Sequence, residues 1–371
     1  MVTANLLLTM SVYMLIPTLP EWLFSVQGFS SVETGLSMGA FALGLYLFGS
    51  LCSWLVQTYR RNVVCMWAII ALVVSELFLW YADRMQTGFA DFPLVLCQRI
   101  VSGATFGLAQ MILSSTLIID TCESYQRTEA NYSSSWFARF ALSLGPLAGL
   151  LSFQLIGFSG TLLGSMGCAA VSVLLIKMVD FPFRAPEEHE HIASLDRFLL
   201  PRGFVLFANL MLVSGALGLL LSQSLSVYFY SMVMVGFLLA LLAGHFVFRN
   251  AEMKSEAVSG LILLMASEAI LLTHPESILS PLFLGLGVGI VSSRFLLFFI
   301  KLSRHCQRGT SQSMYFLGWE TGLALGLGAG CWAVKEGQPD LPLTLALVLT
   351  ALALLMYHFF THAWFMRKKN R

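Results

Sequence analysis

The sequence predicts an all-helical integral membrane protein. Of its 371 residues, 57% are hydrophobic and only 11% are charged, and the mean hydropathy is +0.78. Soluble domains carry about 25% charged residues. Apolar runs of roughly 18 or more residues recur along the chain, as transmembrane helices require, and the alternating pattern of barrel strands is missing. Because every backbone polar group in hydrocarbon needs a partner within its own segment, we expect these runs to be helices.

Twelve apolar runs predict twelve transmembrane helices. In order, they cover residues 2–19, 32–56, 63–81, 92–118, 130–155, 157–176, 203–221, 225–248, 257–272, 279–300, 313–334 and 341–365. One long hydrophilic segment divides them six and six. We therefore expect an N-terminal bundle over 1–178, a cytoplasmic linker over 179–202 and a C-terminal bundle over 203–371. Glu187–His191 in this linker is interpreted as a solvated segment and not as a metal site.

The basic residues predict how the spans are oriented, because Lys and Arg concentrate in cytoplasmic loops. With the N-terminus inside, sixteen of them fall on the inner side and two, Arg84 and Lys335, on the outer side. The remaining three of the 21 lie within spans, namely Arg99, Arg139 and Arg294. Both termini are therefore expected in the cytoplasm, and the short loops favour a bacterial inner-membrane protein.

The two halves of the chain contain an internal repeat at an offset of 181 residues. Tyr125–Gly149 aligns with Cys306–Gly330. The aligned pairs include Asn131 with Gln312, Arg139 with Glu320, and Gly145 with Gly326. Two six-helix halves with parallel symmetry are typical of one architecture of secondary transporters.

Motifs in the fourth span and in the loop before the third make the chain resemble the major facilitator superfamily over its full length. Arg99, Gly103 and Gly107 are similar to the family's Arg-x-x-x-Gly motif. The basic pair Arg60 and Arg61 is similar to its motif between spans two and three. The resemblance implies two pseudo-symmetric six-helix bundles that move substrates by alternating access.

A third motif lies in the fifth span. Gly145, Pro146 and Gly149 are similar to the Gly-Pro-x-x-Gly motif that the family associates with proton-driven antiport, although Leu150 replaces its last glycine. The residues themselves favour a mechanical role, because proline bends a helix and glycine permits close helix contacts.

One charged residue interrupts each of two otherwise apolar spans at a similar depth. Arg139 lies ten residues after Glu129, about 15 Å along a helix and hence near the middle of the membrane. Arginine at such a depth costs about 2.5 to 3.5 kcal/mol to insert, so it should face the bundle interior. Asn131, Ser135 and Ser143 lie on the same helix face as Arg139. In the same way, Gln312 shares the face of Glu320, and Gln110 shares the face of Arg99.

The resemblance implies that Arg139 and Glu320 approach a central cavity from opposite halves. Three interpretations stay open. Glu320 binds the coupled proton and Arg139 biases it, since a nearby cation favours the carboxylate while burial favours the acid. Alternatively, the arginines bind an anionic substrate, because the planar guanidinium group suits carboxylate or phosphate. The third interpretation is a structural ion pair that ties the halves together.

Further residues are candidates for the same cavity. Arg99 and Arg294 either line it or pair with Glu76 and Glu268 in the third and ninth spans. Trp319 beside Glu320 either packs in the core or stacks on a substrate. By the resemblance, Tyr13 and Asn209 line the cavity from spans one and seven.

These features together predict a secondary transporter, with proton-coupled export of a small organic molecule as the favoured activity. Uptake or exchange of an organic anion is the alternative. A membrane-embedded enzyme, the alternative of another class, would need a catalytic motif at a membrane face such as His-Glu-x-x-His, which the sequence does not contain. We expect a small-molecule substrate, protons and the lipid bilayer as partners, a monomer, no cofactor or metal, and no nucleic acid.

Overall fold

The computed structural model describes residues 1–85, 91–121, 127–181, 191–248 and 251–369, without the side chains of residues 119, 127, 128, 131, 132 and 305. Within these ranges all regular secondary structure is helical, which confirms the predicted fold class. The helices of the first half are α1 Val2–Tyr13, α2 Leu15–Ser25, α3 Ser31–Leu47, α4 Cys52–Thr58, α5 Arg61–Met85, α6 Phe92–Ile112, the π-helix η1 Leu113–Leu117, α7 Ile118–Asp120, α8 Arg127–Ile156 and α9 Phe158–Lys177. Those of the second half are η2 Pro201–Gly203, α10 Phe204–Leu221, α11 Val227–Phe246, α12 Met253–Thr273, α13 Leu279–Leu302, η3 His305–Gln307, α14 Arg308–Lys335, α15 Asp340–Met356, the π-helix η4 Tyr357–Thr361 and α16 His362–Lys368.

Each predicted span overlaps one helix or one series of consecutive helices. Among the described residues, ten helical segments are long and apolar enough to cross a membrane. An eleventh is formed if α3 and α4, which bend by 51°, count as one span. The remaining predicted span, 313–334, corresponds to α14, which contains Gln312, Glu320 and repeated glycines and is not among these segments.

Several spans are broken where a single helix was expected. The second span bends between α3 and α4, where the ring of Phe198 lies against Gly49. A Cβ atom at Gly49 would lie 2.0 Å from that ring. The fourth span ends in the π-helix η1, a form of helix that often marks functional positions. Of the expected linker, 182–190 lies outside the described residues, and with it most of Glu187–His191.

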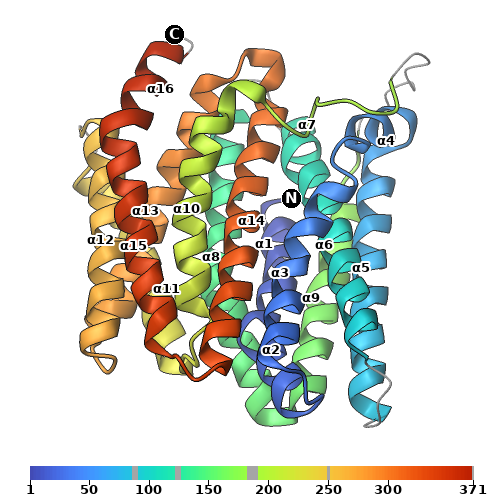
Figure 1. Ribbon diagram of the computed structural model, residues 1–371. Coiled ribbons are helices and arrows are strands. Elements are labelled where there is room, and N and C mark those ends of the chain that lie inside the picture. The colour runs from blue at the N-terminus through green and yellow to red at the C-terminus, as the bar shows by residue number, and fades with distance from the viewer. Residues whose placement is uncertain (86–90, 122–126, 182–190, 249–250, 370–371) are drawn as a thin grey trace.

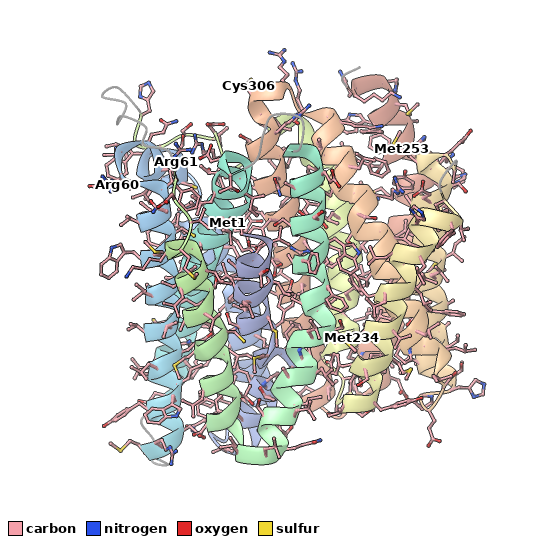
Figure 2. All side chains as sticks on the ribbon, turned by 180° about the vertical axis from the view of Figure 1, so that it is seen from behind. Met1, Arg60, Arg61, Met234, Met253 and Cys306 are labelled. Atoms are coloured by element: carbon pink, nitrogen blue, oxygen red, sulfur yellow. The ribbon has the colours of Figure 1, made fainter. Side chains whose placement is uncertain are left out.

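The helices stand side by side, with the first half of the chain on one side and the second half on the other (Figure 1). The halves meet along two seams, where α3 packs on α14 and where α8 packs on α11 and α13. Side chains cover the helices on all sides (Figure 2), and many apolar ones are exposed, such as Leu155 at 81% and Phe359 at 74%. An apolar outer surface of this kind suits contact with lipid.

One end of the bundle carries Arg60, Arg61 and Cys306 (Figure 2) and is called the basic end below. The other end carries the turns at Gly157 and Gly337 and is called the opposite end. These names refer to the molecule alone. Its orientation in the membrane stays a prediction, as do the domain boundaries.

Glycine contacts repeat in the two halves. A Cβ at Gly145 would lie 2.7 Å from Tyr13 Cβ, so α8 packs closely on α1. A Cβ at the aligned Gly326 would lie 2.1 Å from the Gly215 carbonyl oxygen, so α14 packs in the same way on α10. The predicted internal symmetry is therefore visible in how equivalent helices pack.

Candidate functional site

A cluster of three polar side chains joins the halves in the middle of the bundle. Arg139 Nη1 on α8 lies 2.8 Å from Glu320 Oε1 on α14, and it also donates to the Tyr13 hydroxyl at 3.1 Å. The Tyr13 hydroxyl on α1 donates to the same carboxylate oxygen at 2.7 Å. Within the described residues, Glu320 Oε2 makes no hydrogen bond. Oε1 of Glu320 thus accepts two hydrogen bonds, and Oε2 is available for a further one.

The position of this cluster follows from the internal repeat. Arg139 and Glu320 are aligned residues, and each lies twelve residues after the aligned pair Arg127 and Arg308, about 18 Å along its helix. Two residues that a two-fold axis exchanges can touch only if both lie close to that axis. The ion pair therefore sits at the centre line between the two halves.

Aromatic rings enclose the guanidinium group of Arg139. Its Cζ lies 4.9 Å from the ring centre of Trp319 and 5.8 Å from that of Tyr315. Arg139 and Glu320 are each only 2% exposed. Ring faces attract cations, and removing water strengthens the ion pair while making either charge costly alone. The site therefore depends on the two charges remaining together or being neutralised together.

A small cavity lies beside this cluster. It is lined by α1, α2, α3, α6 and α14, with Tyr13, Arg99 and Glu320 as its polar residues and apolar side chains such as Met38 and Leu327 elsewhere. Its volume is about 30 Å³, which is room for one or two water molecules. An organic substrate does not fit in this volume.

Arg99 is a buried cation without a bonded counter-ion. It is 5% exposed, and its guanidinium carbon lies 4.9 Å from the ring centre of Phe41. Among the described residues it makes no ion pair or hydrogen bond, and its Nε is buried without a partner. Glu76 acts on it only through longer-range electrostatics. A guanidinium group that faces a cavity in this state can accept an anion there.

The halves touch on the opposite-end side of the cavity. A Cβ at Gly328 on α14 would lie 2.7 Å from the Gly35 carbonyl oxygen on α3. Further out, Lys335 Nζ lies 3.0 Å from Glu21 Oε2 on α2. The glycine contact brings the backbones of α3 and α14 close together at this level.

The halves also touch on the basic-end side. A Cβ at Gly309 on α14 would lie 2.9 Å from the Ser115 carbonyl oxygen on η1. Arg197, in the segment between the halves, donates from Nη1 to Thr116 Oγ1 at 3.3 Å and from its backbone to Thr310 Oγ1 at 2.9 Å. The described residues of the two halves are thus in contact on both sides of the cavity.

The remaining polar candidates bond to neighbouring helices and do not line this cavity. Gln110 donates to Thr9 on α1 at 2.7 Å, and Gln312 lies 3.4 Å from the Ser135 hydroxyl across the α8–α14 contact. Asn209 donates to the Ala353 carbonyl oxygen on α15 at 3.0 Å. The side chain of Asn131 lies outside the described residues.

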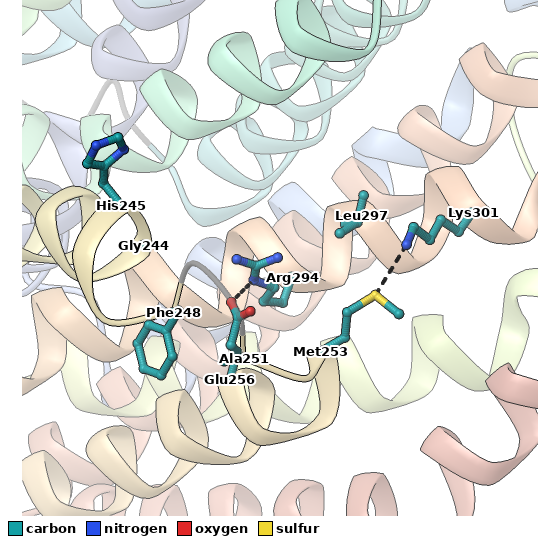
Figure 3. A pocket seen from close by; sticks show the side chains of 9 residues that line it. All are labelled: Gly244, His245, Phe248, Ala251, Met253, Glu256, Arg294, Leu297 and Lys301. Carbon is teal, nitrogen blue, oxygen red and sulfur yellow. Dashed lines mark hydrogen bonds and ion pairs between the residues drawn. The ribbon is translucent and has the colours of Figure 1, made fainter.

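Arg294 does not join the central cavity in this structure. It makes an ion pair with Glu256 at the start of α12, in a separate pocket between α11, α12 and α13 (Figure 3). The partner considered from the sequence, Glu268, instead accepts a hydrogen bond from Thr350 at 2.8 Å. Glu256 was not singled out, because the sequence does not show that α12 begins four residues before the expected start of this span.

The three motifs act as contacts between helices. A Cβ at Gly103 would lie 2.2 Å from the Phe41 carbonyl oxygen, and one at Gly107 would lie 3.0 Å from that of Leu45, so α6 packs closely on α3. A Cβ at Gly149 would lie 2.2 Å from the Met14 carbonyl oxygen. Pro146 lies within α8. At the basic end, Arg61, which follows Arg60, pairs with Asp120 on α7.

Two contributions to the site were missed by sequence reasoning. The Phe41 ring that faces Arg99 carries no charge or motif that would distinguish it from other apolar residues. Lys335 was placed on the outer side, but its pairing with Glu21 depends on how two distant helix ends meet. Only the three-dimensional arrangement reveals either contact.

Comparisons with known proteins agree with this architecture. The sequence profile of the Major Facilitator Superfamily matches residues 1–327. No match was found among curated proteins. Similar solved structures include a POT family transporter, PepTSo, with 12% identity and a TM-score of 0.73 over 99% of this chain and 97% of that one. A D-xylose-proton symporter has 15% identity and a TM-score of 0.70 over 97% and 96%. The E. coli fucose:proton symporter FucP has 13% identity and a TM-score of 0.63 over 96% and 97%. These structures share the fold, and the profile match shows that the chain belongs to the major facilitator superfamily of membrane transporters.

Proposed function

We propose that this chain is a proton-coupled transporter of a small organic molecule, in which Glu320 carries the proton and Arg139 competes with it. The observation that supports this most is the Arg139–Glu320 contact of 2.8 Å between the two halves. Glu320 also borders the cavity. A substrate entering the cavity would therefore meet the carboxylate directly.

The coupling follows from the cost of burying a single charge. Opening the cavity between the halves requires the contact between Arg139 and Glu320 to lengthen, which would leave two uncompensated charges. A proton on Glu320 Oε2 removes one of them, and water or a substrate group can then compensate Arg139. Residues 1–178 and 203–371 are the units that move in this mechanism, with 179–202 as the linker.

The direction of transport is proposed to be export. The basic end would face the cytoplasm, as its many Lys and Arg residues favour, and Gly145-Pro146-x-x-Gly149 is similar to the antiporter motif. The structurally similar proteins named above include proton symporters, so the test must be able to report either direction.

Everted vesicles held at an acidic interior test the proposal. They would contain the native protein or Glu320→Gln, with a proton-sensitive dye reporting interior pH as cationic drugs, organic anions and sugars are added in turn. Under antiport, one class releases protons from native vesicles and none from the variant. Proton movement in the other sense indicates symport, and equal responses from both proteins would rule out Glu320 as the proton carrier.

Transport of an organic anion is the second candidate, favoured by the buried and unbonded Arg99 at the cavity. With Glu320 already paired to Arg139, Arg99 leaves the cavity one positive charge in excess. Arg99→Gln should then abolish transport of carboxylates. The double variant Arg294→Gln and Glu256→Gln, in the separate pocket, is the matched control, because it leaves no charge unpaired, and it should leave the substrate profile unchanged. Equal effects of the two variants would exclude a specific role for Arg99.

A further inference from the structure

A basic pocket lies on the flank of the second half, near the basic end and away from the central cavity. It opens between the end of α11 and the start of α12, with α13 as its floor (Figure 3). Its volume is about 490 Å³, far larger than that of the central cavity. His245, Met253, Glu256, Arg294 and Lys301 provide its polar and sulfur atoms.

The pocket has an excess of positive charge. Arg294, Leu297 and Lys301 follow each other at helical spacing, so all three face it from α13. The one carboxylate in its lining, Glu256, pairs with Arg294 Nε. Lys301 Nζ contacts only Met253 Sδ, at 3.4 Å. Within the described residues, neither Lys301 nor the two Nη groups of Arg294 have an anionic partner beyond Glu256.

The start of α12 adds a second feature that favours an anion. This helix of 21 residues begins at Met253, in the pocket lining, and no side chain among the described residues caps it. The first backbone N–H groups of a helix lack partners within the helix and favour negatively charged ligands. The start of α12 and the side chain of Lys301 on α13 thus border the same pocket.

The surface beside the pocket is apolar. Leu242, Phe246 and Val247 at the end of α11 are 54%, 74% and 71% exposed. In a membrane protein such side chains contact lipid tails. A ligand with a negatively charged headgroup and an apolar body would therefore contact both the basic pocket and the apolar side chains beside it. A small soluble anion would contact only the pocket.

We propose that this pocket binds the headgroup of an anionic phospholipid. The phosphate group contacts Lys301 and the start of α12, deeper headgroup oxygens contact the Nη groups of Arg294, and the acyl chains lie along Leu242 and Phe246. Basic pockets between transmembrane helices are general binding sites for such headgroups. This inference is independent of proton coupling and of the substrate in the central cavity.

Thermal stabilisation of the purified protein in detergent tests the site. The ligands would be short-chain phosphatidylglycerol, short-chain phosphatidylcholine and inorganic phosphate, each titrated separately. We expect phosphatidylglycerol to stabilise the native protein and the other two to do so weakly. Lys301→Gln should weaken phosphatidylglycerol binding about fivefold, from about 1 kcal/mol per basic residue at an anionic surface, and Lys301→Arg should retain binding.

Two further variants complete the design. Arg294→Gln combined with Glu256→Gln removes both charges of the ion pair, so no buried charge is left alone, and it should also weaken binding. Lys177→Gln is the matched control, because Lys177 is an exposed lysine at the last residue of α9, on the same basic end of the bundle as Lys301. Equal stabilisation by both lipids, or equal losses in Lys177→Gln and Lys301→Gln, would overturn the proposal. Full competition by inorganic phosphate would replace the lipid with a soluble anion.

Discussion

Neutralising either member of the Arg139–Glu320 pair should destabilise the protein, and neutralising both should recover much of the loss. Both side chains are 2% exposed, and their charged atoms lie 2.8 Å apart. Removing one partner of such a pair costs about 3–5 kcal/mol, because the other charge stays buried. With about 2.1 cal/mol/K of unfolding entropy per residue, this lowers Tm by roughly 4–6 °C.

Thermal unfolding of four purified proteins measures this coupling: native, Arg139→Gln, Glu320→Gln and the double variant. The account predicts that the double variant unfolds at a higher temperature than either single variant, with a coupling energy of about 3 kcal/mol in the double-mutant cycle. If the losses simply add, the two charges do not depend on each other. The reasoning about the cost of separating them during transport would then fail.

Three other predictions concern contacts between helices. Lys335→Gln removes an ion pair at the rim that is half exposed on its acidic side, so stability measured by urea unfolding should change by less than about 1 kcal/mol. Gly328→Leu should hold α14 away from the glycine that it faces on α3, and so increase labelling of Leu327→Cys by a thiol reagent added at the opposite end. Gly103→Ala should cost about 1–3 kcal/mol in thermal unfolding through its clash with a carbonyl oxygen of α3. Gly167→Ala, where an added Cβ meets nothing within 4 Å, should cost nothing.

Hydrophobic length and charge predicted much of the architecture. The apolar runs identified the long helices, because a transmembrane helix has to be long and apolar whatever it packs against. The repeat aligned Arg139 with Glu320, and the structure brings these two residues into contact. The sequence left a direct contact open as one of three interpretations, because a charge in the membrane needs a partner but the partner can be another side chain, the backbone or a substrate.

Features set by tertiary packing could not be predicted in the same way. At the bend between α3 and α4, Gly49 lies against the ring of Phe198, which is about 150 residues away in the chain. The pairing of Arg294 with Glu256 depends on the position of α12 relative to α13. Tyr13 was expected near the cavity only from the family resemblance, because one hydroxyl in an apolar helix does not reveal its partner.

The most direct test of the central claim compares exchange with accumulation in proteoliposomes, using a substrate identified in the vesicle experiment. Exchange of labelled for unlabelled substrate needs no net proton movement, whereas accumulation against a gradient does. The account predicts that Glu320→Gln keeps exchange and loses proton-driven accumulation. Accumulation at the native level in Glu320→Gln would contradict the claim that this carboxylate carries the coupled proton.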